Sequence, residues 1–162
     1  MNRYEWIKCQ AAGDASEKFV AGLLGAERVG AGSYDLVVDN GRRRMTVDVK
    51  RDDKAADTDN LAIETVSVVE TNAPGWAVTA RADFIVVHVH QPDDCSLYVM
   101  SSQTLRDSLP LIRVACKQKE TQSIRDGRVW TTLFYAPSIM SLMQWGVIHR
   151  TWKAWRGELL SL

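Results

Sequence analysis

The chain has 162 residues, of which 46% are hydrophobic and 25% charged, which is typical of one globular domain with a buried core. Its 20 basic and 20 acidic residues balance, so net charge gives no support for nucleic-acid binding, and three scattered cysteines indicate neither a disulfide framework nor a zinc site. No apolar run is long enough to span a membrane, and the N-terminus lacks the apolar segment of a secretory signal. These features predict a cytoplasmic protein without a membrane partner.

The first predicted element is a helix over residues 3–24, either continuous or interrupted near Gly13, with Gly25 as its C-cap. Glu17 shares one face of this helix with Val20 and Ala21, so the carboxylate is expected to point inward. An inward acid needs a charged partner, a metal ion or an exposed rim, because an isolated buried carboxylate is costly.

Residues 34–50, YDLVVDNGRRRMTVDVK, predict a β-hairpin. Asn40-Gly41 is a strong signal for a two-residue turn, and such a turn places Asp35 opposite Thr46. Side chains alternate along a strand, so one face of the hairpin should form a core while the other is polar. The core face carries Tyr34, Leu36, Val38, Met45, Val47 and Val49, and the polar face carries Asp35, Arg44, Thr46, Asp48 and Lys50.

The rest of the chain alternates predicted strands and helices. Residues 61–69 predict a third strand of the hairpin's meander, and residues 83–90 predict a central strand. The other expected elements are a short strand near 27–29, a helical turn within 71–82, strands at 96–102 and 129–137, a helix over 102–112 capped by Ser101 or Ser102, and a long Trp-rich closing helix at about 138–160. This order predicts one α/β domain, residues 1–162, with a mixed central β-sheet flanked by helices.

The polar face of the hairpin brings together Asp35, Asp48 and Lys50. Two neighbouring carboxylates repel each other, and each has a raised pKa unless a cation lies between them. Mg²⁺ is bound by a few carboxylates together with water and phosphate oxygens. A lysine two residues further on can hold an attacking water or stabilise charge on a phosphate. These groups suit metal-assisted hydrolysis of a phosphodiester. The alternative interpretation is a solvent-exposed strand face with an ion pair, which would contain the same residue types.

The strand YDLVV followed by VDVK resembles the PD-(D/E)xK nuclease superfamily. Asp35 matches the first acid of the motif, and Asp48-Val49-Lys50 matches the D-x-K. Glu17 matches the glutamate that many members add from the preceding helix, among them archaeal Holliday junction resolvases and several restriction endonucleases.

The resemblance extends beyond the motif. The run NLAIETVS…PGWAVTARADFIVVHV…LYVMSSQTLRD is similar to phage-type nucleases of this superfamily, so the resemblance covers about residues 14–109. Tyr34 stands in place of the proline of the name, and Asp48 stands where glutamate is commoner. Neither departure removes a metal ligand.

The resemblance implies a restriction-endonuclease-like fold and a DNA endonuclease that depends on Mg²⁺ or Mn²⁺ and leaves a 5′-phosphate. The implied metal ligands are Asp35, Asp48, Glu17 and the carbonyl of Val49. Lys50 is implied to orient the attacking water or to help deprotonate it.

Other residues near the motif have two interpretations each. Glu64 either supports the metal shell or Lys50, or forms a structural salt bridge. A local basic group is expected to contact DNA phosphates, although a solvated hairpin tip would look the same; it consists of Arg42, Arg43, Arg44 and Arg51. His88 and His90 are expected to be packed and hydrogen-bonded rather than catalytic.

In the closing helix, Trp145, Ile148 and Trp152 have close to helical spacing, which predicts packing against the sheet or a second subunit, with stacking on unpaired bases as the other interpretation. A homodimer would suit cleavage of a double strand or a junction. Two alternatives to a nuclease stay open. One is a non-catalytic nucleic-acid-binding protein on the same fold, and the other is a host-protein-binding module that uses this helix.

Overall fold

The N-terminal helix agrees with its prediction. Helix α1 (Arg3–Leu24) spans the expected range, and Gly25 at φ 59° ends it in the left-handed conformation of a C-cap. The computed structural model describes residues 3–30, 32–91, 94–125, 127–155 and 158–160. Within these ranges no helix is both long and apolar enough to cross a membrane.

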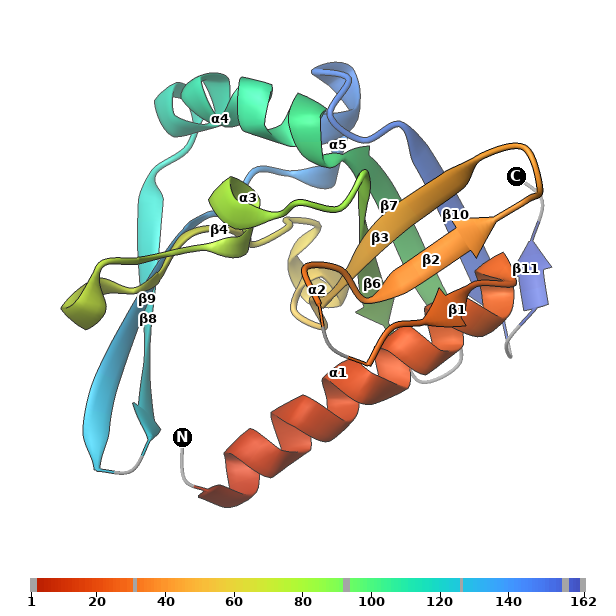
Figure 1. Cartoon of the computed structure of the whole chain (residues 1–162). Helices are drawn as coiled ribbons and strands as arrows, with labels where there is room; N and C mark the ends of the chain where they lie inside the picture. Colours follow the sequence, from red (N-terminus) through yellow and green to blue (C-terminus); the bar gives the residue numbers. More distant parts are fainter. Residues whose placement is uncertain (1–2, 31, 92–93, 126, 156–157, 161–162) are drawn as a thin grey trace.

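A mixed seven-stranded sheet forms the centre of the fold, which confirms the predicted α/β class (Figure 1). Its strands lie in the order β1 (Glu27–Arg28), β2 (Leu36–Asp39), β3 (Arg44–Arg51), β6 (Phe84–His90), β7 (Asp94–Ser101), β10 (Arg150–Trp155) and β11 (Glu158–Leu160). The pair β3 and β6 is parallel, and the other neighbours are antiparallel. The strand predicted to be central, β6, is the fourth of the seven.

A second, antiparallel sheet has the order β5 (Ala73–Pro74), β4 (Ile63–Val68), β9 (Arg128–Tyr135) and β8 (Gln118–Arg125). The prediction that residues 61–69 continue the hairpin's meander is therefore wrong. β3 already pairs with β6 on its free side, and the short helix α2 (Ala55–Thr58) carries the chain away to the second sheet.

The remaining helices are short, except one. The 3₁₀ helix η1 (Val69–Thr71) and helix α3 (Trp76–Thr79) precede β6, and α4 (Ser102–Ala115) follows β7. The Ser101 hydroxyl accepts a hydrogen bond from the backbone N–H of Thr104, which confirms Ser101 as the N-cap of α4. Helix α5 (Ile139–Gln144) begins after the N-cap Ser138.

The predicted long helix over residues 138–160 is wrong. Helix α5 is followed by Gly146 at φ 69°, a left-handed conformation that stops a helix. The chain then forms β10, in which Trp152 lies opposite Leu97 of β7. Residues 156–157 of the predicted range lie outside the described residues.

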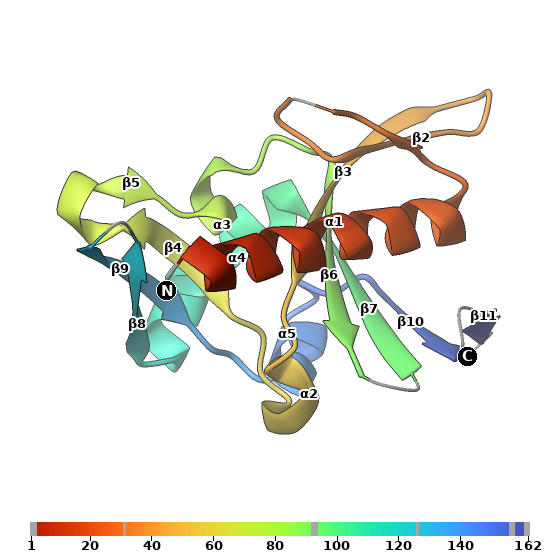
Figure 2. The same cartoon turned by 90° about the horizontal axis from the view of Figure 1, so that it is seen from below.

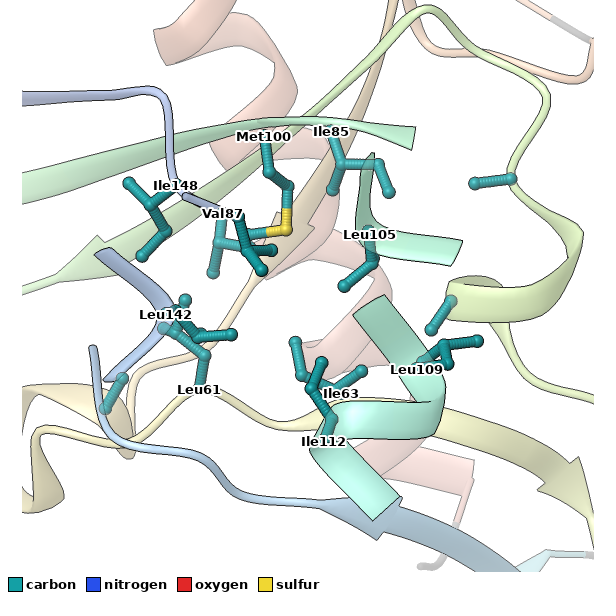
Figure 3. Packing of buried hydrophobic residues seen from close by; sticks show 14 of the residues in the cluster. Leu61, Ile63, Ile85, Val87, Met100, Leu105, Leu109, Ile112, Leu142 and Ile148 are labelled. Atoms are coloured by element: carbon teal, nitrogen blue, oxygen red, sulfur yellow. The ribbon is translucent and has the colours of Figure 1, made fainter. Parts of the chain in front are cut away.

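The two faces of the seven-stranded sheet carry separate cores. On one face, α1 packs Val20 and Ala21 against Leu36, Val47 and Val49, and Figure 2 shows this helix running across the sheet. On the other face, side chains of β6 and β7 pack against β4, α4 and α5 (Figure 3); Ile85, Val87, Met100, Leu105, Ile63 and Leu142 are examples.

Candidate active site

The hairpin β2–β3 has a different register from the predicted one. Leu36 pairs with Val47 and Asp39 with Arg44, so the loop has four residues instead of two. The side-chain oxygen of Asn40 accepts the backbone N–H groups of Arg42 and Arg43, at 3.1 and 2.9 Å, which satisfies the wider loop.

This change of register strengthens the acidic cluster. A shift of two residues leaves every side chain on its predicted face. It moves Asp35 from its predicted place opposite Thr46 to one beside Asp48. The N–H of Asp35 donates to the carbonyl of Val47 at 2.9 Å, and its Oδ2 accepts the N–H of Val49 at 2.7 Å.

Asp48 and Lys50 form the second half of the cluster. They lie two residues apart on β3 and therefore on the same face of the sheet. Asp48 is only 8% exposed, and its Oδ1 lies 2.7 Å from Nζ of the half-buried Lys50. Their neighbours on β6 are Ile85 and Val87, so the charged pair borders the second core directly.

The electrostatics of Asp35 reflect this crowding. Burial raises the pKa of the Asp35 carboxyl, and the neighbouring Asp48 carboxyl raises this pKa further. The hydrogen bond from the Val49 N–H and the charge of Lys50 act in the opposite direction. A bound cation would relieve the repulsion between the two carboxylates.

The cluster opens to solvent through a hollow of about 580 Å³, referred to below as the acidic hollow. It is lined by Gly32, Ser33, Tyr34, Asp35, Asp48, Lys50, Trp76, Thr79, Ala80 and Arg81. One wall is the loop before β2, and the other is α3. Asp35, Asp48 and Lys50 are thus brought together at a place that a substrate can reach.

Glu17 is not part of this cluster. Its carboxylate forms an ion pair with Arg28 at 2.7 Å, on the helix that covers the opposite, apolar face of β3. In the part of the chain that the structure describes, no group of three or more His, Cys, Asp or Glu side chains could hold a metal ion. The donor set at the hollow therefore consists of two carboxylates.

Glu64 lies near Lys50, on β4. Burial raises the pKa of its carboxyl, whereas hydrogen bonds from the Ser67 side chain and the Trp76 backbone N–H, and the charge of Lys50, lower it. Glu64 thus links β4 to the first residue of α3. Gly75, just before α3, passes so close to β4 that an added Cβ would lie 2.4 Å from the Glu64 carbonyl oxygen.

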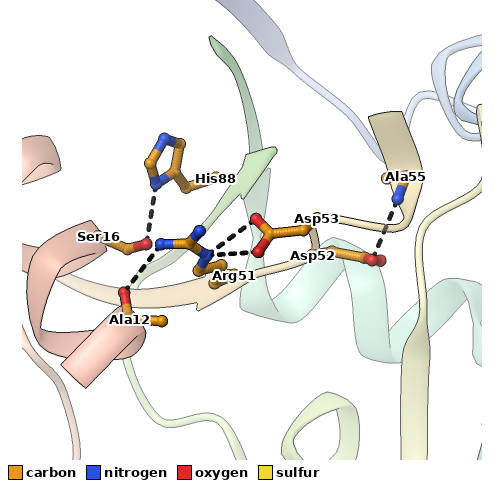
Figure 4. A network of polar contacts seen from close by, with 7 residues as sticks. All are labelled: Ala12, Ser16, Arg51, Asp52, Asp53, Ala55 and His88. Atoms are coloured by element: carbon orange, nitrogen blue, oxygen red, sulfur yellow. Dashed lines mark hydrogen bonds and ion pairs between the residues drawn. The ribbon is translucent and has the colours of Figure 1, made fainter. Parts of the chain in front are cut away.

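The predicted basic group is divided between two places. Arg42, Arg43 and Arg44 are exposed around the hairpin loop. Arg51 is half-buried at the other end of β3, where its Nε donates to both carboxylate oxygens of Asp53 at 2.8 Å and a terminal nitrogen donates to the carbonyl of Ala12 (Figure 4).

His88 is packed, as predicted, whereas His90 at the end of β6 is exposed, so the prediction is wrong for His90. His88 is 3% exposed, it stacks on Phe19, and its Nδ1 lies 2.9 Å from the Ser16 hydroxyl (Figure 4). Burial, helped by the charge of His90, lowers its pKa to about 4, so the ring is neutral at pH 7.

Asp83 was not identified as a site residue, yet it positions β3. Its Oδ2 accepts the backbone N–H and the hydroxyl of Thr46 at 2.8 and 3.0 Å, and its own N–H donates to the Thr46 hydroxyl at 2.9 Å. These three bonds fix the start of β3 beside β6. The sequence signal was the Asp immediately before a buried strand.

The chain matches no family model, no curated protein and no solved structure.

Proposed function

We propose that this chain is a DNA endonuclease of the PD-(D/E)xK type, with a restriction-endonuclease-like fold, that depends on Mg²⁺ or Mn²⁺. One observation carries the proposal. The register of β2 and β3 puts Asp35 beside Asp48, with Lys50 hydrogen-bonded to Asp48, at the floor of an open hollow.

The residues present fit a hard divalent cation. Asp35 and Asp48 are two neighbouring carboxylates that are open to water. Mg²⁺ and Mn²⁺ bind to such a pair of carboxylates when a phosphate supplies further oxygen ligands. Asp35 and Asp48 would hold the ion, with the Val49 carbonyl as a further ligand implied by the resemblance. When bound, the ion would activate water and neutralise charge on the phosphate.

The protein's own groups have separate tasks in this proposal. The Val49 N–H fixes Asp35 Oδ2, so this carboxylate is oriented before any ligand arrives. Lys50 orients the attacking water and stabilises the charge that develops on the phosphate oxygens. Glu64 supports Lys50 electrostatically and ties α3 to β4. Glu17, paired with Arg28, keeps at most an indirect role.

The host-protein-binding alternative loses the surface on which it rested. Its contact surface was a Trp-rich helix, whereas Trp152 lies on β10 and packs beside the α1 core. A non-catalytic nucleic-acid-binding protein would bind DNA without cleaving it, so a cleavage assay distinguishes this role from a nuclease.

The test is a cleavage assay with Mg²⁺, Mn²⁺ or EDTA on linear duplex, supercoiled plasmid, single strand, four-way junction and RNA. Wild type is compared with Lys50→Ala and with Lys18→Ala, an exposed lysine of α1 that lines neither the acidic hollow nor its neighbour. We expect metal-dependent cutting of DNA that Lys50→Ala loses and Lys18→Ala keeps. Folded wild-type protein that cuts none of these substrates would overturn the proposal.

A further inference from the structure

A second hollow, of about 500 Å³, adjoins the acidic hollow and shares Lys50 and Trp76 with it. We call it the inter-sheet hollow, because its lining comes from both sheets. Its lining also includes Asp52, Lys54, Glu64, Lys119 and Phe134. In Figure 1 the hairpin β8–β9 stands away from the seven-stranded sheet, with β4 and α2 between them.

The side chains that β8 and β9 contribute to the inter-sheet hollow lie on one face of the second sheet. Lys119 pairs with Phe134, and Thr121 pairs with Thr132 two residues along, so these four side chains share a face of β8 and β9. Glu64 of β4 lies opposite Phe134 on the other side. This wall presents an aromatic ring and an ammonium group to the hollow.

The acids of the inter-sheet hollow are engaged inside the protein. Asp52 accepts the backbone N–H groups of Ala62 at 2.8 Å and Ala55 at 3.3 Å. Glu64 accepts the N–H of Trp76. Lys54 and Lys119 are exposed, and neither forms an ion pair among the described residues.

The chemistry left for a ligand is therefore two flat aromatic side chains and two cations. Trp76 and Phe134 are half-buried, which leaves ring surface for stacking, and the lysines suit phosphate oxygens. Aromatic rings beside a basic groove are the means by which proteins bind unpaired nucleotides. A volume of about 500 Å³ lies within the range of small-ligand pockets.

A paired base cannot use such a site, because both of its faces are stacked inside the duplex. We propose that the inter-sheet hollow binds an unpaired nucleotide of the strand whose scissile phosphate lies in the acidic hollow. The substrate is then DNA that is single-stranded at the cut, as in a single strand or a flap. This inference rests on the proposed function, and it names the substrate class of the same site.

The first test is binding without catalysis. Fluorescence anisotropy in EDTA compares a labelled single strand with a blunt duplex of the same sequence. The key variant is Lys119→Gln, and Lys117→Gln is its matched control, an exposed lysine two residues away that does not line the hollow. Phe134→Leu keeps apolar volume while removing the ring.

We expect the single strand to bind at least about tenfold more tightly than the duplex. Lys119→Gln should weaken this binding about threefold to tenfold and lower its salt dependence, and Phe134→Leu should weaken it about fivefold or more. Lys117→Gln should match wild type. Equal binding of the two DNA forms, or equal effects of the two lysine substitutions, would overturn the inference.

The outcomes separate this inference from the proposed function. Metal-dependent cutting that favours duplex over single strand would retain the nuclease and reject the inter-sheet hollow as an unpaired-nucleotide site. Preferential binding of single strands that depends on Lys119, without cutting in any metal, would retain this site and reject the nuclease.

Discussion

The two faces of strand β3 have opposite characters. Val47 and Val49 are buried against α1. Asp48 and Lys50 alternate with them along the strand, so they lie on the other face, where they line the acidic hollow. One strand therefore contributes both to the core and to the candidate site. Apolar burial on the α1 side stabilises the hairpin, so the other side can keep two neighbouring carboxylates whose repulsion opposes folding.

On the face of the sheet that carries Asp48 and Lys50, the covering elements change between β6 and β3. On β6, Ile85 and Val87 share the face of Asp48 and Lys50, but they are covered by β4, α4 and α5. That cover ends before β3, where α3 and its residue Trp76 form the wall. Asp48 and Lys50 occupy the part of this face that borders the acidic hollow.

Substitution on the charged face should produce the largest effect. Asp48→Asn should lower metal-dependent cleavage by about 10³-fold or more, because a ligand and the partner of Lys50 are lost together. The unfolding temperature should stay close to that of wild type, as measured by circular dichroism. Wild-type cleavage by this variant would show that the site assignment is wrong.

Substitution on the apolar face should do the reverse. Leu36 is fully buried under α1, so Leu36→Ala should lower the free energy of unfolding by about 3 kcal/mol in urea titrations. Cleavage per folded molecule should change little. Val38→Ala, at a half-buried position of the same strand, is the control and should lose about 1 kcal/mol. Equal losses would contradict this description of the core.

The wall opposite the charged face depends on Gly75. Gly75→Ala brings a Cβ against the backbone of Glu64, so it should destabilise the fold by about 1–3 kcal/mol and displace Trp76. The control Gly22→Ala lies in α1 with open space around it, and it should stabilise the protein by up to about 1 kcal/mol. Thermal unfolding of both variants measures the difference, and a neutral Gly75→Ala would refute the close approach.

The apolar face holds the buried ring of His88, which should give stability a pH dependence. The pKa of His88 is about 4 when folded and 6.5 ordinarily, so the unfolded chain binds the proton first as the pH falls. Stability should therefore decrease from pH 6.5 towards pH 4, by roughly 1–2 kcal/mol at pH 5. Urea titrations at several pH values should show that His88→Gln loses less stability than wild type between pH 6.5 and pH 4. The same pH dependence in both proteins would contradict the role given to His88.

The smallest effect should come from relieving the charge repulsion. Because the folded pKa of Asp35 is raised, ionisation of this carboxyl reduces stability as the pH rises above its ordinary value of 3.8. Asp35→Asn still accepts the Val49 N–H, and without added metal it should be more stable at pH 7 by about 0.5 kcal/mol, since solvent screens the half-buried group. If calorimetry showed Asp35→Asn to be less stable than wild type, this result would contradict repulsion between the Asp35 and Asp48 carboxylates.

Much of this arrangement follows from local patterns. The alternation in residues 34–50 predicts the two faces of the paired strands correctly, because a two-residue change of register preserves them. Tyr34 is the exception, because it lies before β2 and lines the acidic hollow instead of the core. The register itself depends on the Asn40 side chain, which satisfies the loop in a way that the dipeptide signal does not reveal. The inward face of α1 was also predicted, but a helical pattern does not say which face of a sheet lies beneath it. Glu17 consequently meets Arg28 instead of the acids.

The second sheet and the C-terminal strands required tertiary information. β8, QKETQSIR, is polar on both faces and has no apolar alternation. The segment Arg150–Trp155 has aromatic spacing that fits a helix as well as a strand, and pairing with β7 decides it. The inter-sheet hollow, with Lys119 and Phe134, depends on the pairing of β8 with β9 in the second sheet and was therefore missed.

Calorimetric titration of Mn²⁺ into the metal-free protein asks whether the charged face of β3 is a divalent-cation site. Wild type is compared with Asp35→Asn/Asp48→Asn, in which both carboxylates become neutral amides of nearly the same shape. We expect saturable binding to wild type and none to the double variant, which should remain folded. Binding of equal strength to both proteins, or to neither at millimolar Mn²⁺, would contradict this expectation.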